Sequence, residues 1–384
     1  MKNCYGCGVC SASCGKDIIS IKLNRNGFYE PYISNPDMCT NCGICLDVCA
    51  FSHPELANNN TVSLKSWAAW SNHTDVRHKC SSGGIGFEIG KQLIEQGYHA
   101  VGCRYDTKSQ RAEHYIATTV EDFAASIGSK YIQSYTADAF SQIKKRGQKY
   151  LITGTPCQID SFRRMIRKFK CEENFVLLDF FCHCVPSMHV WKAYMKMLEP
   201  KIGKITYASW RNKFDYGWRD SWLMGLDGEK TAKPVDWHDS YNTFWQYRKS
   251  QGDLFYKLVL GDLALGPQCG TQCKYKYDKS SADIRIGDLW GKTYQNDEKG
   301  TRALIAFTEK GCQIIENLHG VTLIEHPFDV VAEGQMKENA HAKELYSLVM
   351  WYLRKGYCIT NPLFKCFLLL QRIITRINII IGRK

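Results

Sequence analysis

Residues 4–14 read CYGCGVCSASC, and residues 39–49 read CTNCGICLDVC. Both stretches space four cysteines as C-x2-C-x2-C-x3-C. Three thiolates two residues apart can wrap one iron–sulfur cube, and in two-cluster arrangements the fourth cysteine of each run ligates the other cluster. The spacing therefore predicts two 4Fe-4S clusters, one held by Cys4, Cys7, Cys10 and Cys49 and the other by Cys39, Cys42, Cys45 and Cys14.

Between the two runs the sequence predicts a β-hairpin. Residues 18–23 and 28–32 are rich in isoleucine and aromatic residues, and residues 24–27 (NRNG) form a turn sequence between them. The proline that usually follows the fourth cysteine is replaced by Gly15 and Ala50. Despite this departure, residues 1–55 are expected to form a small dicluster ferredoxin domain.

Disulfides and zinc are the two other common uses of clustered cysteines. A disulfide framework belongs to secreted proteins, but no apolar signal segment stands before Cys4. Tetrahedral zinc sites favour separated pairs of ligands, whereas each run here has a triplet followed by a fourth cysteine. Both alternatives fit the duplicated spacing less well than iron–sulfur clusters do.

Composition indicates a large globular protein of a reducing compartment. The chain has 384 residues, 44% of them hydrophobic, and 19 cysteines, so we expect a cytoplasmic protein. The formal net charge of +12 counts cysteines as neutral, and each cluster with its four thiolates lowers it by about two charges. Without a recognisable nucleic-acid-binding motif, the remaining basic residues suit an anionic cofactor or an acidic partner.

After an expected linker over residues 56–76, helical and strand patterns alternate. The predicted strands cover residues 98–103, 149–153, 174–181 and 205–209, and the predicted helices cover residues 138–146, 158–168 and 187–198. This order predicts an α/β core over residues 77–336, built on a mixed sheet and α+β in the chain as a whole. Further on, residues 300–310 and 312–318 predict a strand and a helix.

A glycine-rich turn begins the core. Ser81, Ser82, Gly83 and Gly84 precede a helix pattern that starts at Ile85. Free amides at a helix N-terminus attract anions, which suits the phosphate of a flavin or nucleotide. A plain helix cap, with glycines for close packing, explains the same residues, and the turn alone does not decide between the two.

Four more cysteines follow predicted strand ends and a later turn. Cys157, Cys182, Cys269 and Cys273 together supply the thiolates for a third 4Fe-4S cluster, and Cys184 is an alternative to Cys182. They come from three distant segments, and free cysteine is also a common core residue. Sequence spacing leaves both interpretations open.

These segments resemble a known family, coenzyme F420 hydrogenase/dehydrogenase beta subunits, over roughly residues 1–330. The matching motifs, in the same order, are residues 80–84 (CSSGG), 154–158 (GTPCQ), 181–183 (FCH), 185–187 (VPS), Cys269 with Cys273, and residues 282–288 (ADIRIGD). Relatives include 7-hydroxymethyl chlorophyll reductase and bacterial members from polysaccharide-biosynthesis gene clusters, which this chain resembles most.

The resemblance implies FAD at Ser81, Ser82, Gly83 and Gly84, and a third 4Fe-4S cluster nearby in the core. Lys130, in a segment similar to a recurrent family motif, is a candidate for the flavin phosphate or the ring, although it also fits a solvated surface lysine. Cys184 stands where relatives often have glycine, so the resemblance leaves open which of Cys182 and Cys184 faces the iron.

The expected function is that of an iron–sulfur flavoprotein oxidoreductase. Its partners would be a soluble ferredoxin or other redox protein and an organic small molecule, with a sugar intermediate or a deazaflavin as candidate substrates. His183 and Asp288 are candidate catalytic residues; alternatively, the histidine is structural and the aspartate forms an ion pair. The competing hypothesis is an electron-carrier subunit without its own substrate.

A helical tail is expected over residues 337–384. Apolar residues dominate residues 362–384, and Lys365, Arg372 and Arg376 share one helical face. These charges disfavour a membrane span and suit an amphipathic helix on an anionic membrane surface, hence peripheral contact at the inner membrane face. Packing on the core or on a second subunit is the alternative.

Overall fold

The N-terminal unit contains a hairpin and two single-turn helices. The computed structural model describes residues 4–58, 65–144, 146–213, 217–231 and 243–382. Strands β1 (Ile19–Leu23) and β2 (Tyr29–Ile33) pair antiparallel, as predicted, and the Asn24 side chain accepts the amide hydrogens of the turn. Helices α1 (Val9–Ala12) and α2 (Ile44–Asp47) begin after glycines in the left-handed region, so each cysteine run bends in the same way.

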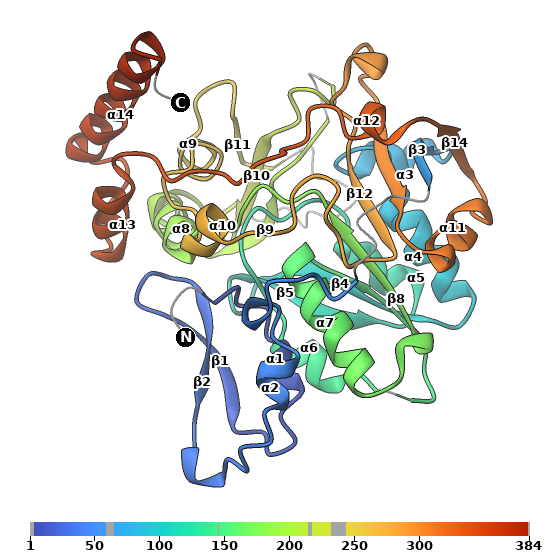
Figure 1. Cartoon of the computed structure of the whole chain (residues 1–384). Helices are drawn as coiled ribbons and strands as arrows, with labels where there is room; N and C mark the ends of the chain where they lie inside the picture. Colours follow the sequence, from blue (N-terminus) through green and yellow to red (C-terminus); the bar gives the residue numbers. More distant parts are fainter. Residues whose placement is uncertain (1–3, 59–64, 145, 214–216, 232–242, 383–384) are drawn as a thin grey trace.

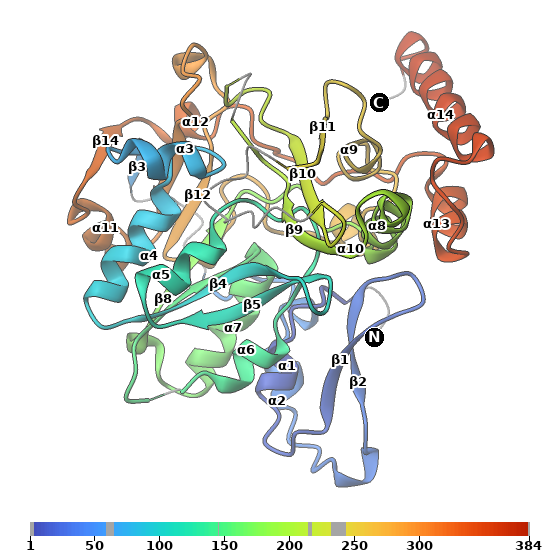
Figure 2. The ribbon, with the colours of Figure 1, turned by 180° about the vertical axis from the view of Figure 1, so that it is seen from behind.

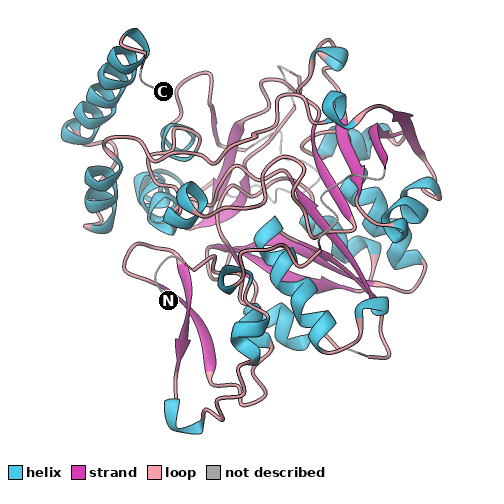
Figure 3. Cartoon of the chain, viewed as in Figure 1, coloured by secondary structure: helices cyan, strands magenta, loops and turns pink. Residues whose placement is uncertain are grey.

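The core is a mixed nine-stranded sheet in the order β14-β3-β13-β12-β8-β7-β4-β5-β6 (Figures 1 and 3). The pairs β12–β8, β8–β7, β7–β4 and β5–β6 are parallel and the others antiparallel, so the predicted mixed sheet is confirmed. The strands are β3 (Lys65–Ser71), β4 (His99–Asp106), β5 (Arg111–Ala117), β6 (Ser134–Tyr135), β7 (Tyr150–Thr153), β8 (Phe175–Phe180), β12 (Ile284–Asp288), β13 (Arg302–Ala306) and β14 (Val321–Glu325).

A second sheet lies beside the first and has three antiparallel strands. They are β9 (Ile205–Ser209), β10 (Leu223–Gly228) and β11 (Trp245–Arg248). Helix α8 (Met188–Ile202) packs on this sheet, and its buried Trp191 and Tyr194 share a core with Trp210 and Phe255. The predicted strand over 205–209 is therefore real, but it belongs to this smaller sheet.

Helices and short turns complete the core (Figure 2). They are α3 (Thr74–Lys79), α4 (Ile85–Glu95), α5 (Val120–Phe123), α6 (Ala137–Gln142), α7 (Pro156–Lys168), α9 (Leu254–Val259), α10 (Pro267–Thr271), α11 (Glu309–Glu316), α12 (Phe328–Val331), α13 (Tyr346–Arg354) and α14 (Pro362–Ile380). Within the described part of the chain, none of these helices is long and apolar enough to cross a membrane.

The expected linker over residues 56–76 is wrong for its second half. Residues 65–71 form β3, which lies inside the sheet between β14 and β13. Ala68 and Ala69 are fully buried and Trp67 nearly so. Since both faces of β3 are covered, its sequence lacks the alternation that marks a half-exposed strand.

The N-terminal unit is docked on the core. Val9 and Val48 from this unit share a buried cluster with Phe140 of α6 and with Ile159 and Phe162 of α7. Figure 1 shows α1 and α2 beside α6 and α7, and contacts between these helices support the view. The two cysteine runs are thereby fixed relative to the core sheet.

Candidate redox centre

The first N-terminal cysteine group draws members from both runs. Cys7 is buried, and burial followed by the charge of Cys4 raises its thiol pKa to about 12. For Cys10, burial and the charges of Cys7, Cys4 and Cys49 raise the pKa. Cys49 is thus close to the three cysteines of the opposite run, which is the exchange of fourth ligands that the spacing predicts.

The second group lies farther out. Burial, and then the charges of Cys42, Cys14 and Cys39, raise the pKa of Cys45. Cys39 and Cys42 are exposed, and Cys14 and Cys45 are partly exposed. Four thiols of one set therefore gather at the surface and four of the other set gather at the core side.

The core cysteines come from segments that follow parallel strands. Since β7 and β8 are parallel, their carboxyl ends lie at one edge of the sheet, and Cys157 and Cys182 follow these ends. Cys269 lies in α10 and Cys273 just after it. Backbone hydrogen bonds from Gly266 to Val185 and from Ser187 to Ala264 hold the α10 segment against the Cys182 loop.

These segments enclose a small cavity of about 30 Å³ whose wall includes Cys157, Cys182, Cys184, Cys269 and Cys273. Burial raises the thiol pKa of Cys182 to about 12, and the nearby charges of Cys269 and Cys273 add to the shift. The charges of Cys182 and Cys269 likewise raise the pKa of Cys157. Four of these five cysteines would supply the sulfur donors that a 4Fe-4S cluster requires.

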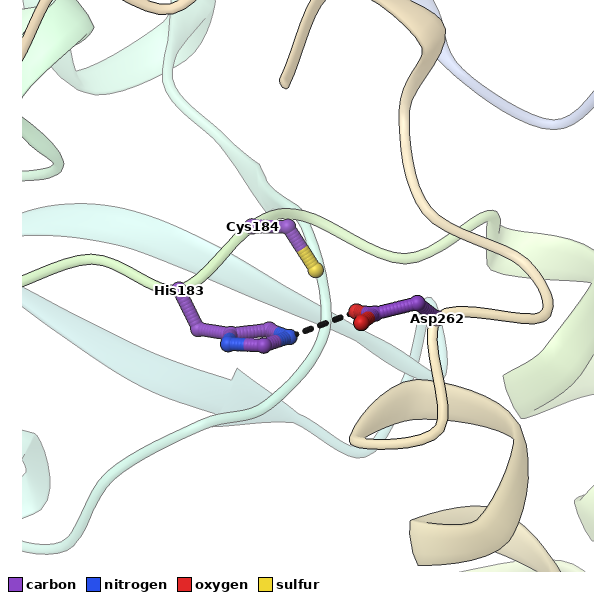
Figure 4. A group of neighbouring side chains, drawn as sticks. All are labelled: His183, Cys184 and Asp262. Carbon is purple, nitrogen blue, oxygen red and sulfur yellow. Dashed lines mark hydrogen bonds and ion pairs between the residues drawn. The ribbon is translucent and has the colours of Figure 1, made fainter. Parts of the chain in front are cut away.

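Cys182 fits the cluster better than Cys184. Burial, and then the charges of Cys269, Cys182 and Asp262, raise the pKa of Cys184. Cys182 interacts with Cys157, Cys269 and Cys273. Figure 4 shows the Cys184 sulfur directed toward Asp262 and His183. The arrangement therefore favours Cys182 as the fourth sulfur donor.

His183 is held by a carboxylate. Its Nε2 lies 2.7 Å from Oδ1 of Asp262 (Figure 4), and since a carboxylate only accepts, Nε2 carries the hydrogen. The other ring nitrogen lies 2.9 Å from Sδ of Met336. The ligand atoms of His183, Cys184 and Asp262 all lie within 4.8 Å of one another.

Helix α7 connects the first N-terminal group with the core group. Cys157 stands in its first turn, and Ser161 one turn later accepts a hydrogen bond from Cys7 (Sγ–Oγ, 3.3 Å). The charge of Cys7 also contributes to the raised pKa of Cys157. A capping box between Thr155 and Gln158 fixes the start of the helix, so the two cysteine groups have a rigid spacing.

A large cavity of about 470 Å³ lies next to the core cysteines. Its wall includes Cys157 and Cys182 at one place and Ser81, Gly84 and Lys130 at another. This volume falls within the range of about 300–1,000 Å³ that is typical of small-molecule sites. A single space therefore reaches from the glycine-rich turn to the core sulfur donors.

The predicted cofactor residues divide into two groups. Ser81 and Gly84 line the cavity, and the Ser81 hydroxyl accepts a hydrogen bond from the amide of Ser129 (2.8 Å). Ser82 and Gly83 are absent from the described cavity wall: the Ser82 hydroxyl donates to the carbonyl of Thr301, and a Cβ on Gly83 would lie 2.5 Å from a backbone oxygen of β3. These two residues pack the turn against the sheet.

Lys130 is half-buried at the cavity wall. Its ammonium donates to the carbonyls of Ser126 and Ile127 (both 2.9 Å) and, at 3.4 Å, to that of Ala125. Burial lowers its pKa to about 8. The ammonium group of Lys130 therefore faces backbone carbonyls, and its role toward a flavin stays a prediction.

Cations surround the glycine-rich turn. Lys213 is buried and donates to the carbonyls of Arg77, Ser82 and Lys299, and burial lowers its pKa to about 7. The charges of Arg77, Arg211 and Arg302 act on Lys213 in the same direction. Asp297 pairs with Arg77, and Asp288 pairs with both other arginines, so four cationic groups face two carboxylates.

Three residues of the cavity wall carry buried polar atoms without a hydrogen-bond partner among the described residues. They are His114 (Nδ1), Trp222 (Nε1) and Arg302 (Nε). His114 Nε2 donates to the carbonyl of Thr153 at 3.0 Å, and burial lowers the imidazole pKa to about 4, so Nδ1 is a free acceptor at neutral pH. Because such atoms are costly when unpaired, the cavity suits a polar ligand.

Family models match most of the chain. The C-terminal model of the coenzyme F420 hydrogenase/dehydrogenase beta subunit matches residues 147–326, and its N-terminal model matches residues 66–141. The chain belongs to this family. A 4Fe-4S dicluster domain model matches residues 3–52, which confirms the prediction for the N-terminal unit.

Solved structures include a member of a related complex. The F420-reducing [NiFe] hydrogenase complex from Methanosarcina barkeri contains a chain that is 16% identical, with a TM-score of 0.45 over 77% of this chain and 90% of that chain. No curated protein matches significantly. The family and dicluster matches together identify the present chain as an iron–sulfur electron-transfer protein of the oxidoreductase type.

Asp288 is not a free carboxylate but is held by two arginines. It lines the cavity at the end of β12, but its two oxygens accept from Arg211 (2.8 Å) and Arg302 (2.9 Å). Asp288 thus lines the cavity and is also ion-paired, and its catalytic role stays a prediction. The carboxylate fixes the guanidinium group of Arg302 at the cavity wall and also pairs with the buried Arg211.

Sequence reasoning missed several residues of the cavity. Trp222 and Trp290 line the cavity with their ring centroids 5.0 Å apart. The guanidinium of Arg211, which is outside the cavity wall, lies 4.6 Å from the Trp222 ring centroid. His114 stands on β5, which was not predicted, although residues 111–117 alternate in burial. The high density of tryptophans in the sequence was the available signal for this part of the cavity. Which of them line it could be seen only in the folded structure.

Proposed function

We propose that this chain is an iron–sulfur flavoprotein oxidoreductase that exchanges electrons between ferredoxin-type 4Fe-4S clusters and an organic substrate, with FAD in the large cavity. The observation that carries the proposal is the single cavity wall that includes both the glycine-rich turn and the core cysteines. A bound flavin supplies the exchange between two-electron organic chemistry and one-electron clusters.

The turn end of the cavity supports an anionic group. Lys130 is half-buried at the cavity wall, and Lys213 is buried beside the glycine-rich turn. Among the described residues, the hydrogen bonds of both ammonium groups go to backbone carbonyls. Gly84 begins α4, so the positive end of this helix faces the cavity there. Negative charge from a pyrophosphate would offset the desolvation that lowers the pKa of both lysines.

Other wall residues support a flat heteroaromatic ring. Trp222 and Trp290 stack on each other, and Arg211 and Trp218 also lie against these rings, so the wall contributes hydrogen-bonding groups rather than a free stacking face. His114 Nδ1 offers an acceptor for a ring N–H group. Trp222 Nε1 offers a donor for a ring carbonyl. Together the nitrogens of His114 and Trp222 would orient the bound ring.

His183 is the proposed proton donor to the substrate, through Nδ1, once the substrate takes the place of the Met336 sulfur that lies 2.9 Å from this nitrogen. It lines the large cavity beside Cys182, and Asp262 fixes the orientation of its ring. Asp288 keeps Arg302 at the wall, where its charge can attract an anionic substrate, and also pairs with the buried Arg211. A sugar intermediate of polysaccharide biosynthesis and a deazaflavin are both substrates that carry phosphate groups and match this charge.

The exposed cysteine group suits a protein partner such as a soluble ferredoxin. Cys39 and Cys42 reach the surface beside the exposed apolar side chains of Met38 and Leu46. Small exposed apolar patches around a redox centre fit transient electron-transfer encounters. An electron carrier without a substrate does not require a cavity with unpaired polar atoms. The cavity therefore disfavours the electron-carrier alternative.

The test compares Cys157→Ala with Cys312→Ala, a buried cysteine of α11 outside both cavities, in full-length protein prepared anaerobically. Reduced ferredoxin is mixed with each variant, and flavin bleaching is followed together with the iron content. Cys157→Ala should lose about four irons and its fast flavin reduction, since one cluster lacks a ligand. Cys312→Ala should behave like the unmodified protein.

Full iron content and unchanged flavin reduction in Cys157→Ala would contradict the assignment of the core cluster. Protein without flavin that still reduces an external acceptor would instead support the carrier alternative.

A further inference from the structure

Helix α14 is attached to the molecule by one face. Phe364 and Leu368 are buried there, and the Phe364 ring lies 4.8 Å from the ring of Tyr352 on α13. Gln371 is also buried and donates to Glu344 (2.6 Å). Figures 1 and 2 show α13 and α14 at the periphery, with α14 reaching away from the sheets.

The opposite face of α14 is apolar and exposed. Leu363, Leu370, Ile373, Ile377 and Ile380 recur at intervals of three, four and seven residues, which places them in one stripe. All are at least 46% exposed, and Ile380 reaches 82%. Large apolar side chains lined up along a helix in this way mark an interaction surface.

Cations flank this stripe. Lys365, Arg372 and Arg376 are exposed and lie on one side of it, at helical spacings of seven and four residues. After Glu344 the printed sequence contains no Asp or Glu, while its basic residues there are Arg354, Lys355, Lys365, Arg372, Arg376, Arg383 and Lys384. The region around the apolar stripe is therefore strongly positive.

This charge selects among the surfaces that could cover the stripe. A second copy of α14 would bring the same cations together without acidic residues to pair with them. Anionic lipid headgroups would pair with the cations while the acyl region covers the isoleucines. The three charges on α14 disfavour a transmembrane position, in agreement with the absence of a spanning helix among the described residues.

We propose that α14 lies in the interface of an anionic membrane, with the stripe of Leu363, Leu370, Ile373, Ile377 and Ile380 in the acyl boundary and Lys365, Arg372 and Arg376 on headgroups. The rest of the protein is then held at the membrane surface through the α13–α14 packing. This inference is independent of the flavin and of the substrate.

The experiment is flotation of the full-length holoprotein with vesicles of phosphatidylcholine alone or with about one third phosphatidylglycerol. Binding to the mixed vesicles and little binding to the neutral ones is expected. Ile373→Glu/Ile377→Glu should abolish binding, and Arg372→Glu/Arg376→Glu should weaken it about tenfold or more. Because all four side chains are exposed, iron content and circular dichroism should stay unchanged.

Lys108→Glu/Lys144→Glu is the matched control, since these exposed lysines lie far from α14 in the sequence and remove the same charge. Its vesicle binding should stay close to that of the unmodified protein. Equal loss in this control, equal binding to neutral vesicles, or full binding by Ile373→Glu/Ile377→Glu would overturn the proposal. A dimer that the isoleucine variant dissolves, without vesicle binding, would assign the stripe to a second copy.

Discussion

Cys182 and Cys184 stand two residues apart, and their surroundings separate their roles. Cys182 interacts with the three other core cysteines, whereas Cys184 is directed toward His183 and Asp262. A thiolate that ligates iron must face the other ligands, so side-chain direction rather than spacing decides between the two.

Cys182→Ala should therefore lose about four irons per chain, while Cys184→Ala should keep all of them. Anaerobic iron and sulfide determination on both variants measures the difference. The reverse result, with iron lost only in Cys184→Ala, would assign the cluster to Cys184.

His114 links cavity chemistry to pH. Its folded-state pKa is about 4, below the ordinary value of 6.5, because burial disfavours the charged ring. The unfolded state then binds a proton more readily, so His114 contributes stability above pH 6.5 that is lost as the pH falls toward 4. This pKa shift corresponds to about 3 kcal/mol in the free energy of unfolding.

His114→Leu should flatten this part of the pH profile. Urea unfolding of the variant and the unmodified protein between pH 7 and about 4.5 measures the change in unfolding free energy. An identical pH dependence in both proteins would show that His114 is not a neutral buried group.

The site residues differ in how far the sequence alone can predict them. The cysteine runs are ligands spaced by local geometry, so their grouping was predictable and the family model agrees. Lys130 and Ser81 line the same cavity but belong to separate segments. The helix start indicated an anion site at Ser81, whereas only the resemblance pointed to Lys130. His114 and Trp222 required the fold, because their common cavity joins β5 to the small sheet.

At the scale of elements, β8 and β12 position two site segments together. They pair in parallel, and Arg285 lies opposite Asp179 in the register. Both side chains are fully buried and form two hydrogen bonds of 2.7 Å, with Nε to Oδ1 and Nη2 to Oδ2. The pair lies just before the Cys182 loop on β8 and before Asp288 on β12.

Arg285→Met should lower the free energy of unfolding by about 3–5 kcal/mol, because Asp179 would stay buried without its countercharge. The urea midpoint measures this loss. Arg285→Met/Asp179→Leu removes both charges and should recover much of it. A double variant as unstable as the single one would show that the charge imbalance is not the cause.

The elements also show why part of the fold was predictable. Helices α7 and α8 combine strong amphipathic patterns with caps at Thr155 and Ser187, and both were expected close to their observed bounds. β3 and β5 were missed. β3 is covered on both faces, and long-range pairing rather than local pattern decides that residues 65–71 enter the sheet.

At the scale of the whole molecule, the cysteine groups lie in order from surface to cavity. The exposed group of Cys39 and Cys42 is followed by the group of Cys7, which contacts Ser161 on α7. The core group at Cys157 begins the same helix and borders the large cavity. Such an order suits electron transfer between a protein partner at the surface and a cofactor in the cavity.

The most direct measurement is the amount of iron, sulfide and acid-released flavin in the anaerobically purified full-length chain. About twelve irons and one flavin per chain are expected, as three clusters beside a flavin site require. About eight irons without flavin would contradict this expectation, because only the N-terminal clusters would then be present.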